Sequence, residues 1–279
     1  MSHLTLKDFD PERLFVLPLG IGNAFTSRYF NASFIIFAEG RAILVDCPAP
    51  FRRVLREATT KAGIELGLED IEYIILTHLH GDHCNGLEEV GFYKYFVLGE
   101  KRTNIYTLSR LIRPLWSKKL ALSMSEVSAP ESSGRVDVDI DTYFRMHGWN
   151  DRGVYGLAEL GSTIEVQIRR TKHSVPCFGF FMRFGDLSIA YSADTPFEQE
   201  HIDFLAPADL IIHETGPSRN HSPLEKLAEL PQEIRDKVVL IHLDDDFDES
   251  KSPIPALREG ALYEVGAGRE PIDPSRARR

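Results

Sequence analysis

Short apolar runs separated by polar turns recur along both ends of the chain. Strands are predicted at 13–18 and across 33–46, where Glu39-Gly40 would form the turn between two of them. Residues 51–62 have helical spacing and stop before Gly63, a residue type that commonly ends helices. Residues 71–76, IEYIIL, are nearly all apolar, which is typical of a strand buried on both faces.

The pattern loses its regularity after Leu87 and recovers near residue 163. Further strands are then predicted, with sequences TIEVQIRRT, FGFFMRF, LSIAYSADT, ADLIIHET and KVVLIHLDDD. Alternating strands and helices predict an α/β protein in which helices cover the sheets. We expect a single domain over 1–279, with an insertion or lid segment at about 88–160, because long irregular stretches inside compact domains are usually functional.

Composition narrows the classes of protein. The 279 residues carry a formal charge of −10, which argues against nonspecific binding to duplex DNA and leaves other nucleic acids open as partners. No apolar run reaches the ~20 residues that span a bilayer, and the N-terminus lacks a signal-peptide pattern, so no membrane association is expected. The three cysteines suit a reducing compartment, and the cytoplasm is the predicted location.

The strongest chemical signal directly follows the apolar run at 71–76. The sequence Thr77-His78-Leu79-His80-Gly81-Asp82-His83 places three imidazoles and a carboxylate within six residues. These groups suit zinc, iron or manganese. His78 and His80 alternate as on an extended chain and would face one side, while Gly81 permits a turn toward a second metal ion.

HLHGDH at 78–83 resembles the HxHxDH signature of the metallo-β-lactamase superfamily. The resemblance continues in the family's order through TKHSVPCFGF, YSADT, IIHET and VVLIHLDDD. LGIGNAF at 19–25, together with HSVPCFGF, SADT and HET, is similar to the ribonuclease Z, arylsulfatase and phosphodiesterase branch. The resemblance implies a four-layer αββα sandwich with a dinuclear metal site at one edge, and it makes a homodimer plausible.

Carried over by position, the resemblance implies a set of metal ligands. His78, His80 and His173 would hold the first metal ion, and Asp82, His83 and His242 the second, with Asp194 bridging the two. His213 also ends an apolar strand and is the alternative to His242 as a ligand. Asp82 would also orient the attacking group or accept its proton, and His213 with Glu214 would assist departure of the leaving group.

The predicted activity is hydrolysis of a phosphodiester, such as a cyclic nucleotide or another small or single-stranded one, by a metal-bridging hydroxide. The cofactors would be two divalent ions, zinc first and manganese or iron as alternatives, and the substrate a small anion. A carboxylic-ester, lactone or thioester hydrolase and a di-iron redox protein remain alternatives on the same site. A metal-stabilised binding or partner protein that has lost catalysis is a third alternative.

Some segments depart from the ribonuclease Z pattern. DCPAPFRR at 46–53 replaces an acidic, glycine-containing turn, and His242 leads into Leu-Asp-Asp-Asp instead of small hydroxyl residues. No tRNA-binding arm is recognisable in 88–150, which weighs against tRNA processing. The basic residues of 101–120 could contact an anionic substrate or form a solvated helix face, and His147 and Trp149 could line the pocket.

Overall fold

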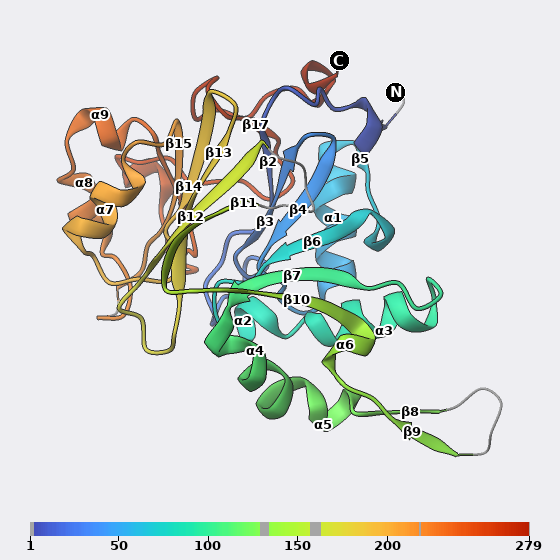
Figure 1. Cartoon of the computed structure of the whole chain (residues 1–279). Helices are drawn as coiled ribbons and strands as arrows, with labels where there is room; N and C mark the ends of the chain where they lie inside the picture. The colour runs from blue at the N-terminus through green and yellow to red at the C-terminus, as the bar shows by residue number, and fades with distance from the viewer. Residues whose placement is uncertain (1–2, 129–133, 157–162, 218, 279) are drawn as a thin grey trace.

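The computed structural model describes residues 3–128, 134–156, 163–217 and 219–278. Two large β-sheets pack face to face within this part of the chain (Figure 1). The first sheet has the order β10 (Phe144–Trp149), β7 (Thr103–Leu108), β6 (Ile71–Ile75), β4 (Arg41–Val45), β3 (Ser33–Ala38), β2 (Phe15–Gly20) and β17 (Tyr263–Glu264). Strands β4, β6, β7 and β10 are parallel, and the other pairings are antiparallel.

The second sheet is also mixed. Its order is β11 (Arg152–Gly156), β12 (Ile164–Arg170), β13 (Phe178–Phe184), β14 (Leu187–Tyr191), β15 (Leu210–Glu214) and β16 (Val238–Ile241). The first four strands are antiparallel neighbours, and β14, β15 and β16 run parallel. The carboxyl ends of β12, β14, β15 and β16 therefore lie at the same edge of this sheet.

Helices cover the outer face of each sheet. The first sheet is covered by α1 (Phe51–Ala62) and α3 (Leu87–Phe96), and the second by α7 (Gln199–Leu205), α8 (Leu224–Ala228) and α9 (Gln232–Arg235) (Figure 1). This is the predicted four-layer αββα sandwich. None of the described helices has the length and apolar character needed to cross a membrane.

Smaller elements complete the described chain. They are the helices α2 (Gly81–Cys84), α4 (Ser109–Leu115), α5 (Ala121–Met124) and α6 (Ile140–Tyr143), a π-helical turn at Trp116–Leu120, the 3₁₀ turns Leu6–Asp8, Leu68–Asp70, Glu249–Lys251 and Pro274–Ala277, and the strand pairs β1 (Leu4–Thr5) with β5 (Ile64–Glu65) and β8 (Glu126–Ser128) with β9 (Arg135–Asp137).

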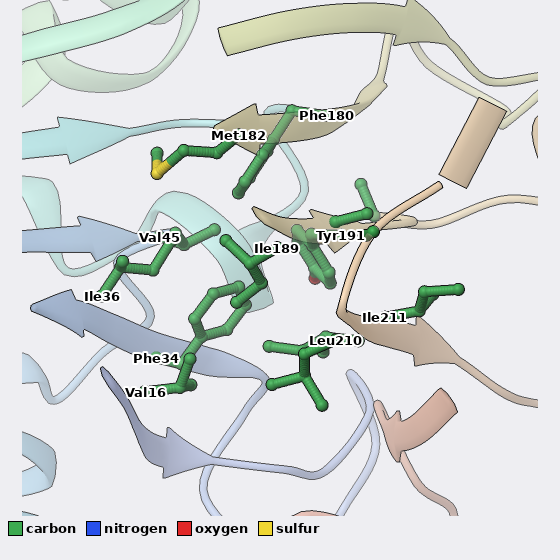
Figure 2. Packing of buried hydrophobic residues seen from close by; sticks show 14 of the residues in the cluster. Val16, Phe34, Ile36, Val45, Phe180, Met182, Ile189, Tyr191, Leu210 and Ile211 are labelled. Carbon is green, nitrogen blue, oxygen red and sulfur yellow. The ribbon is translucent and has the colours of Figure 1, made fainter. Parts of the chain in front are cut away.

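Strand β3 illustrates how the layers are joined. Its residues alternate between two cores, as the two-residue period of a strand requires. Phe34 and Ile36 lie between the sheets, where Phe34 meets the ring of Tyr191 edge-on at 5.0 Å (Figure 2). Ile35 and Phe37 face α1 and α3 on the other side. Burial on both faces explains why 34–38 is a continuous apolar run and why 71–75 is apolar except at the exposed Glu72.

The helix and the turn predicted near the N-terminal end are confirmed, and the strand predicted at 13–18 lies at Phe15–Gly20. Helix α1 spans 51–62 and ends at Gly63, whose φ of 64° is the left-handed conformation that favours glycine. Glu39 and Gly40 both have positive φ in the turn between β3 and β4, which suits the twist of a tight hairpin.

The segment 88–160 contributes three strands to the two large sheets. It supplies β7 and β10 to the first sheet and β11 to the second, while α4, α5 and the β8–β9 hairpin lie at one end of the molecule (Figure 1). Trp149 is buried between the sheets and stacks on Tyr155, and His147 stacks on Tyr106. These two side chains therefore pack in or against the core instead of lining a pocket.

Candidate metal centre

Seven side chains from both sheets meet at the carboxyl ends of the strands. Their ligand atoms form two groups, His78, His80, His173 and Asp194 in one and Asp82, His83 and His242 in the other, and within each group the atoms lie within 4.8 Å of one another. A third, overlapping group joins Asp194 and His242 to His221. His78 and His80 follow β6, His173 follows β12, Asp194 follows β14 and His242 follows β16, while Asp82 and His83 lie on α2. The structure thus brings together every side chain predicted to hold a metal ion.

Asp194 lies between the two groups. Its Oδ2 atom is 3.7 Å from Nε2 of His78 and 3.6 Å from Nε2 of His242, and its Oδ1 atom is 3.5 Å from Nε2 of His83. Donor atoms around a tetrahedral zinc ion are about 3.3 Å apart, given Zn–N distances of about 2.0–2.1 Å. Asp194 is therefore placed to reach both ion positions.

The cluster fits metal ions because several of its polar atoms are otherwise unused. Nε2 of His78, His83 and His242 and Oδ1 of Asp194 are buried and have no hydrogen-bond partner among the described residues. Leaving such atoms unpaired costs free energy, which bound cations would remove. Histidine and carboxylate donors suit Zn, Mn and Fe alike, so the donor set leaves the metal unassigned.

Hydrogen bonds fix the imidazole tautomers so that these nitrogens face inward. Nδ1 of His83 donates to Oδ2 of Asp46 at 2.8 Å. The Thr77 hydroxyl donates to the same carboxylate, so it accepts from Nδ1 of His78 at 3.0 Å. In the neutral form of both histidines, Nε2 is then the unprotonated atom that can bind a cation.

Three residues at the ends of strands have left-handed backbone conformations. Asp46 has φ of 57°, Ala193 of 49° and His242 of 62°, values that are uncommon for residues other than glycine. Each lies where a strand ends beside the cluster, so the chain turns sharply and aims Asp46, Asp194 and His242 at it. Strained conformations of this kind concentrate at functional sites.

The charge of the cluster also favours cations. Burial lowers the pKa of His78 and His80 and lowers that of His173 to about 4, which keeps these imidazoles neutral as metal binding requires. Burial alone would lower the pKa of His242, but Asp194 and Asp82 raise it to about 9. The carboxylates of the cluster therefore generate a field that attracts positive charge.

His213 and Glu214, which were predicted to act together, point to opposite faces of β15. His213 is buried outside the cluster, and its Nδ1 atom is 2.7 Å from its neighbour's carbonyl oxygen. Adjacent residues on β15 point to opposite faces of the sheet, so only Glu214 faces the cluster. Glu214 accepts hydrogen bonds at Oε1 from the backbone N–H of Thr195 at 2.8 Å and from Nδ1 of His221 at 3.1 Å. His242, and not His213, lies beside Asp82.

Sequence reasoning missed His221 and Asp46. His221 follows Glu214 by seven residues in a loop, and its ring stacks on His242 with centroids 4.9 Å apart. Burial alone would lower the pKa of His221, but the hydrogen bond and negative charge of Glu214 raise it. Asp46 could have been suspected because it follows a strand, as the metal-ligating candidates do.

A pocket of about 390 Å³ opens above the cluster. Its walls include His80, Asp82, His173, Asp194, His221 and His242, together with Phe25 from the loop after β2. No described residue of 88–160 lines this pocket. Lys119 is the basic residue that comes near this pocket. It donates a hydrogen bond to Oδ1 of Asn85 at 3.2 Å, and Asn85 lines an adjoining hollow together with Asp82. Both the lid and the contact of basic residues with an anion stay predictions.

The buried His213 yields a prediction about acid stability. Burial lowers the pKa of His213 to about 4, so the unfolded chain takes up this proton first as pH falls below about 6.5. The free energy of unfolding should therefore fall by about 2 kcal/mol from pH 7 to pH 5 because of this one histidine. Urea unfolding of His213→Asn should show a correspondingly weaker loss over this interval. An unchanged pH dependence would contradict the buried, neutral state of His213.

Comparisons with known proteins agree with this geometry. Residues 14–259 match the family model described as Anti-Pycsar protein Apyc1. A protein of that name from Paenibacillus sp. (strain J14) is 30% identical over 254 residues, covering 88% of this chain and 96% of the relative. The cAMP/cGMP-dependent 3′,5′-cAMP/cGMP phosphodiesterase B of Dictyostelium discoideum is 26% identical, covering 93% of this chain and 23% of that protein.

Solved structures share the fold. The metallo-β-lactamase fold protein YhfI from Bacillus subtilis matches with a TM-score of 0.71 at 17% identity, covering 90% of this chain and 99% of that one. The short form of human tRNase Z matches with a TM-score of 0.65 at 19% identity, with the same coverage.

The αββα sandwich and the histidine–carboxylate cluster define a metal-dependent hydrolase of the metallo-β-lactamase fold, in its phosphodiesterase-like branch. Within that class, the chain belongs to the Anti-Pycsar protein Apyc1 family.

Proposed function

We propose that this protein is a dinuclear phosphodiesterase that hydrolyses 3′,5′-cyclic nucleotides to nucleoside monophosphates. The observation that carries the proposal is the position of Asp194 between two histidine groups, beside the Glu214–His221 pair. The pocket above them lies near the lower end of the range of ligand-site volumes, about 300–1,000 Å³, and so suits a mononucleotide. The name of the Dictyostelium relative, a cAMP/cGMP phosphodiesterase, supports the same substrate class.

In this proposal, His78, His80, His173 and Asp194 would hold one divalent ion, and Asp82, His83, His242 and Asp194 would hold the other. When bound, such a pair of ions lowers the pKa of an attacking water and stabilises the attacking and leaving oxygens of the phosphodiester. Asp46 keeps Nε2 of His83 in the metal-binding tautomer through its hydrogen bond to Nδ1.

Asp82 and His221 carry the two proton transfers. Asp82 borders the pocket, and its Oδ2 atom is 3.2 Å from Nε2 of His83. Its carboxylate accepts the proton of the water that attacks phosphorus. The bond from phosphorus to one ester oxygen breaks, and protonated His221, held by Glu214, donates a proton to that oxygen. The net reaction adds one water to the cyclic diester and yields a monoester.

A substrate comparison tests the proposal. Protein loaded with zinc or manganese should convert a 3′,5′-cyclic nucleotide to a nucleoside monophosphate, identified by phosphorus NMR, and should leave a p-nitrophenyl carboxylic ester largely intact. Chelation should abolish turnover and lower the melting temperature, because the buried cluster then loses its counter-charge. Ester turnover without phosphodiester turnover would replace the proposal with a carboxylic-ester hydrolase. A visible absorption band from bound iron with neither activity would indicate a redox protein.

A further inference from the structure

The loop between β2 and β3 is tied to the segment that follows His242. The backbone N–H of Leu243 donates to the carbonyl of Ile21 at 2.7 Å, and that of Asn23 donates to the carbonyl of Leu243 at 3.0 Å. The residue directly after His242, a candidate metal ligand, is therefore joined to the start of the loop by two backbone hydrogen bonds.

Asp245 organises the tip of this loop. Its carboxylate accepts hydrogen bonds from the Thr26 hydroxyl, from the backbone N–H of Ser27 at 2.9 Å and its hydroxyl at 2.6 Å, and from the backbone N–H of Arg28 at 3.2 Å. The acidic run after His242, which departs from the ribonuclease Z pattern, thus has a specific role. It fixes the conformation of residues 26–28.

The loop presents Phe25 at the mouth of the pocket. The Phe25 side chain is 92% exposed, and its backbone N–H donates to Oδ1 of Asn23 at 2.9 Å. Among the described residues that line the pocket, Phe25 has the only large apolar side chain, and the rest of the lining includes His80, Asp82 and His242 of the cluster. An aromatic ring on an ordered loop loses little conformational entropy when a ligand contacts it.

We infer that Phe25 is the stacking platform for the substrate's nucleobase and that Asp245 is the positioning residue that holds it in place. The inference rests on the proposed function. A cyclic nucleotide whose phosphate lies at the cluster must extend its base toward the rim of the pocket, where the Phe25 ring is exposed. Stacking on one ring tolerates every base, because all bases have a π-face, so the platform favours nucleotides over diesters without a base.

Kinetics of Phe25→Ala test the inference. KM for a 3′,5′-cyclic nucleotide should rise about 10-fold or more, with kcat within about 2-fold, since stacking contributes about one to two powers of ten in affinity. Turnover of a ribose 3′,5′-cyclic phosphate that carries a methoxy group in place of the base should not change. Leu122→Ala removes an equally exposed apolar side chain on α5 and should leave both substrates unaffected. An unchanged KM for the nucleotide in Phe25→Ala would overturn the inference.

Two further variants separate stacking from loss of structure. Phe25→Trp should retain a low KM, and the added indole fluorescence should be quenched by the cyclic nucleotide but not by the diester without a base. Asp245→Ala should raise KM for the nucleotide while metal content stays at the wild-type value, and combining it with Phe25→Ala should add little. Absence of quenching, or full additivity, would contradict the inference.

Two results with the wild-type protein would distinguish failure of the stacking inference from failure of the proposed phosphodiesterase function. Hydrolysis of the diester without a base, with the same KM as the nucleotide, would retain the phosphodiesterase and remove the stacking platform. Hydrolysis of neither substrate by the metal-loaded wild type would remove the proposed function itself.

Discussion

Replacing Asp194 by alanine is expected to lower phosphodiester turnover on the order of 10³-fold or more and to reduce the bound metal ions below two per chain. Asp194 contacts both ligand groups and is 2% exposed, so no neighbouring water can easily replace its carboxylate. Without the shared anion, two dications would repel each other across the cluster. The loss should exceed that from removing one hydrogen-bond donor to a transition state, about 10²–10³-fold.

Elemental analysis and turnover of the same preparation give the measurement for Asp194→Ala. Asp186→Ala, which removes an exposed carboxylate in the turn between β13 and β14, serves as the matched control and should behave as wild type. Circular dichroism checks that the variant is folded. Two tightly held metal ions in folded Asp194→Ala would contradict the bridging position.

Replacing His221 by alanine is expected to lower kcat for a 3′,5′-cyclic nucleotide by about 10²–10⁴-fold while both metal ions are retained. This is the usual contribution of a general acid. The effect should depend on the leaving group. A ribose alkoxide needs a proton as it departs, whereas p-nitrophenolate departs without one, so bis-p-nitrophenyl phosphate should lose far less activity.

His3→Ala removes an exposed histidine near the N-terminus and is the control for His221→Ala. Glu214→Gln should reproduce the selective loss in part, because the amide cannot supply the negative charge that raises the pKa of His221. An equal loss on both substrates would mean that His221 acts through the metal centre and not as a proton donor.

The family resemblance singled out the seven side chains that the structure brings together, and each lies at or directly after a recognisable element. HLHGDH directly follows β6, and Asp194 and His242 follow β14 and β16, so strand ends that are distant in sequence meet at one edge of the sandwich. Apolar runs of the fully buried strands were equally readable. These signals are local, and the fold only had to bring them together.

Other features depended on contacts that no local pattern encodes. His213 and Glu214 are adjacent on a strand, so one of them must face away from the site, and the sequence alone did not say which. The role of His221 depends on a hydrogen bond that closes a loop back onto Glu214. The edge strands β10 and β11 lie in an irregular stretch, and their membership of the sheets comes from pairing with β7 and β12.

Metal titration of the chelated protein, with hydrolysis of a 3′,5′-cyclic nucleotide followed at each step, tests the central claim most directly. We predict that activity appears with bound zinc or manganese and reaches its maximum at two ions per chain, with a nucleoside monophosphate as product. Full activity of the metal-free protein, or a maximum at one ion per chain, would contradict it.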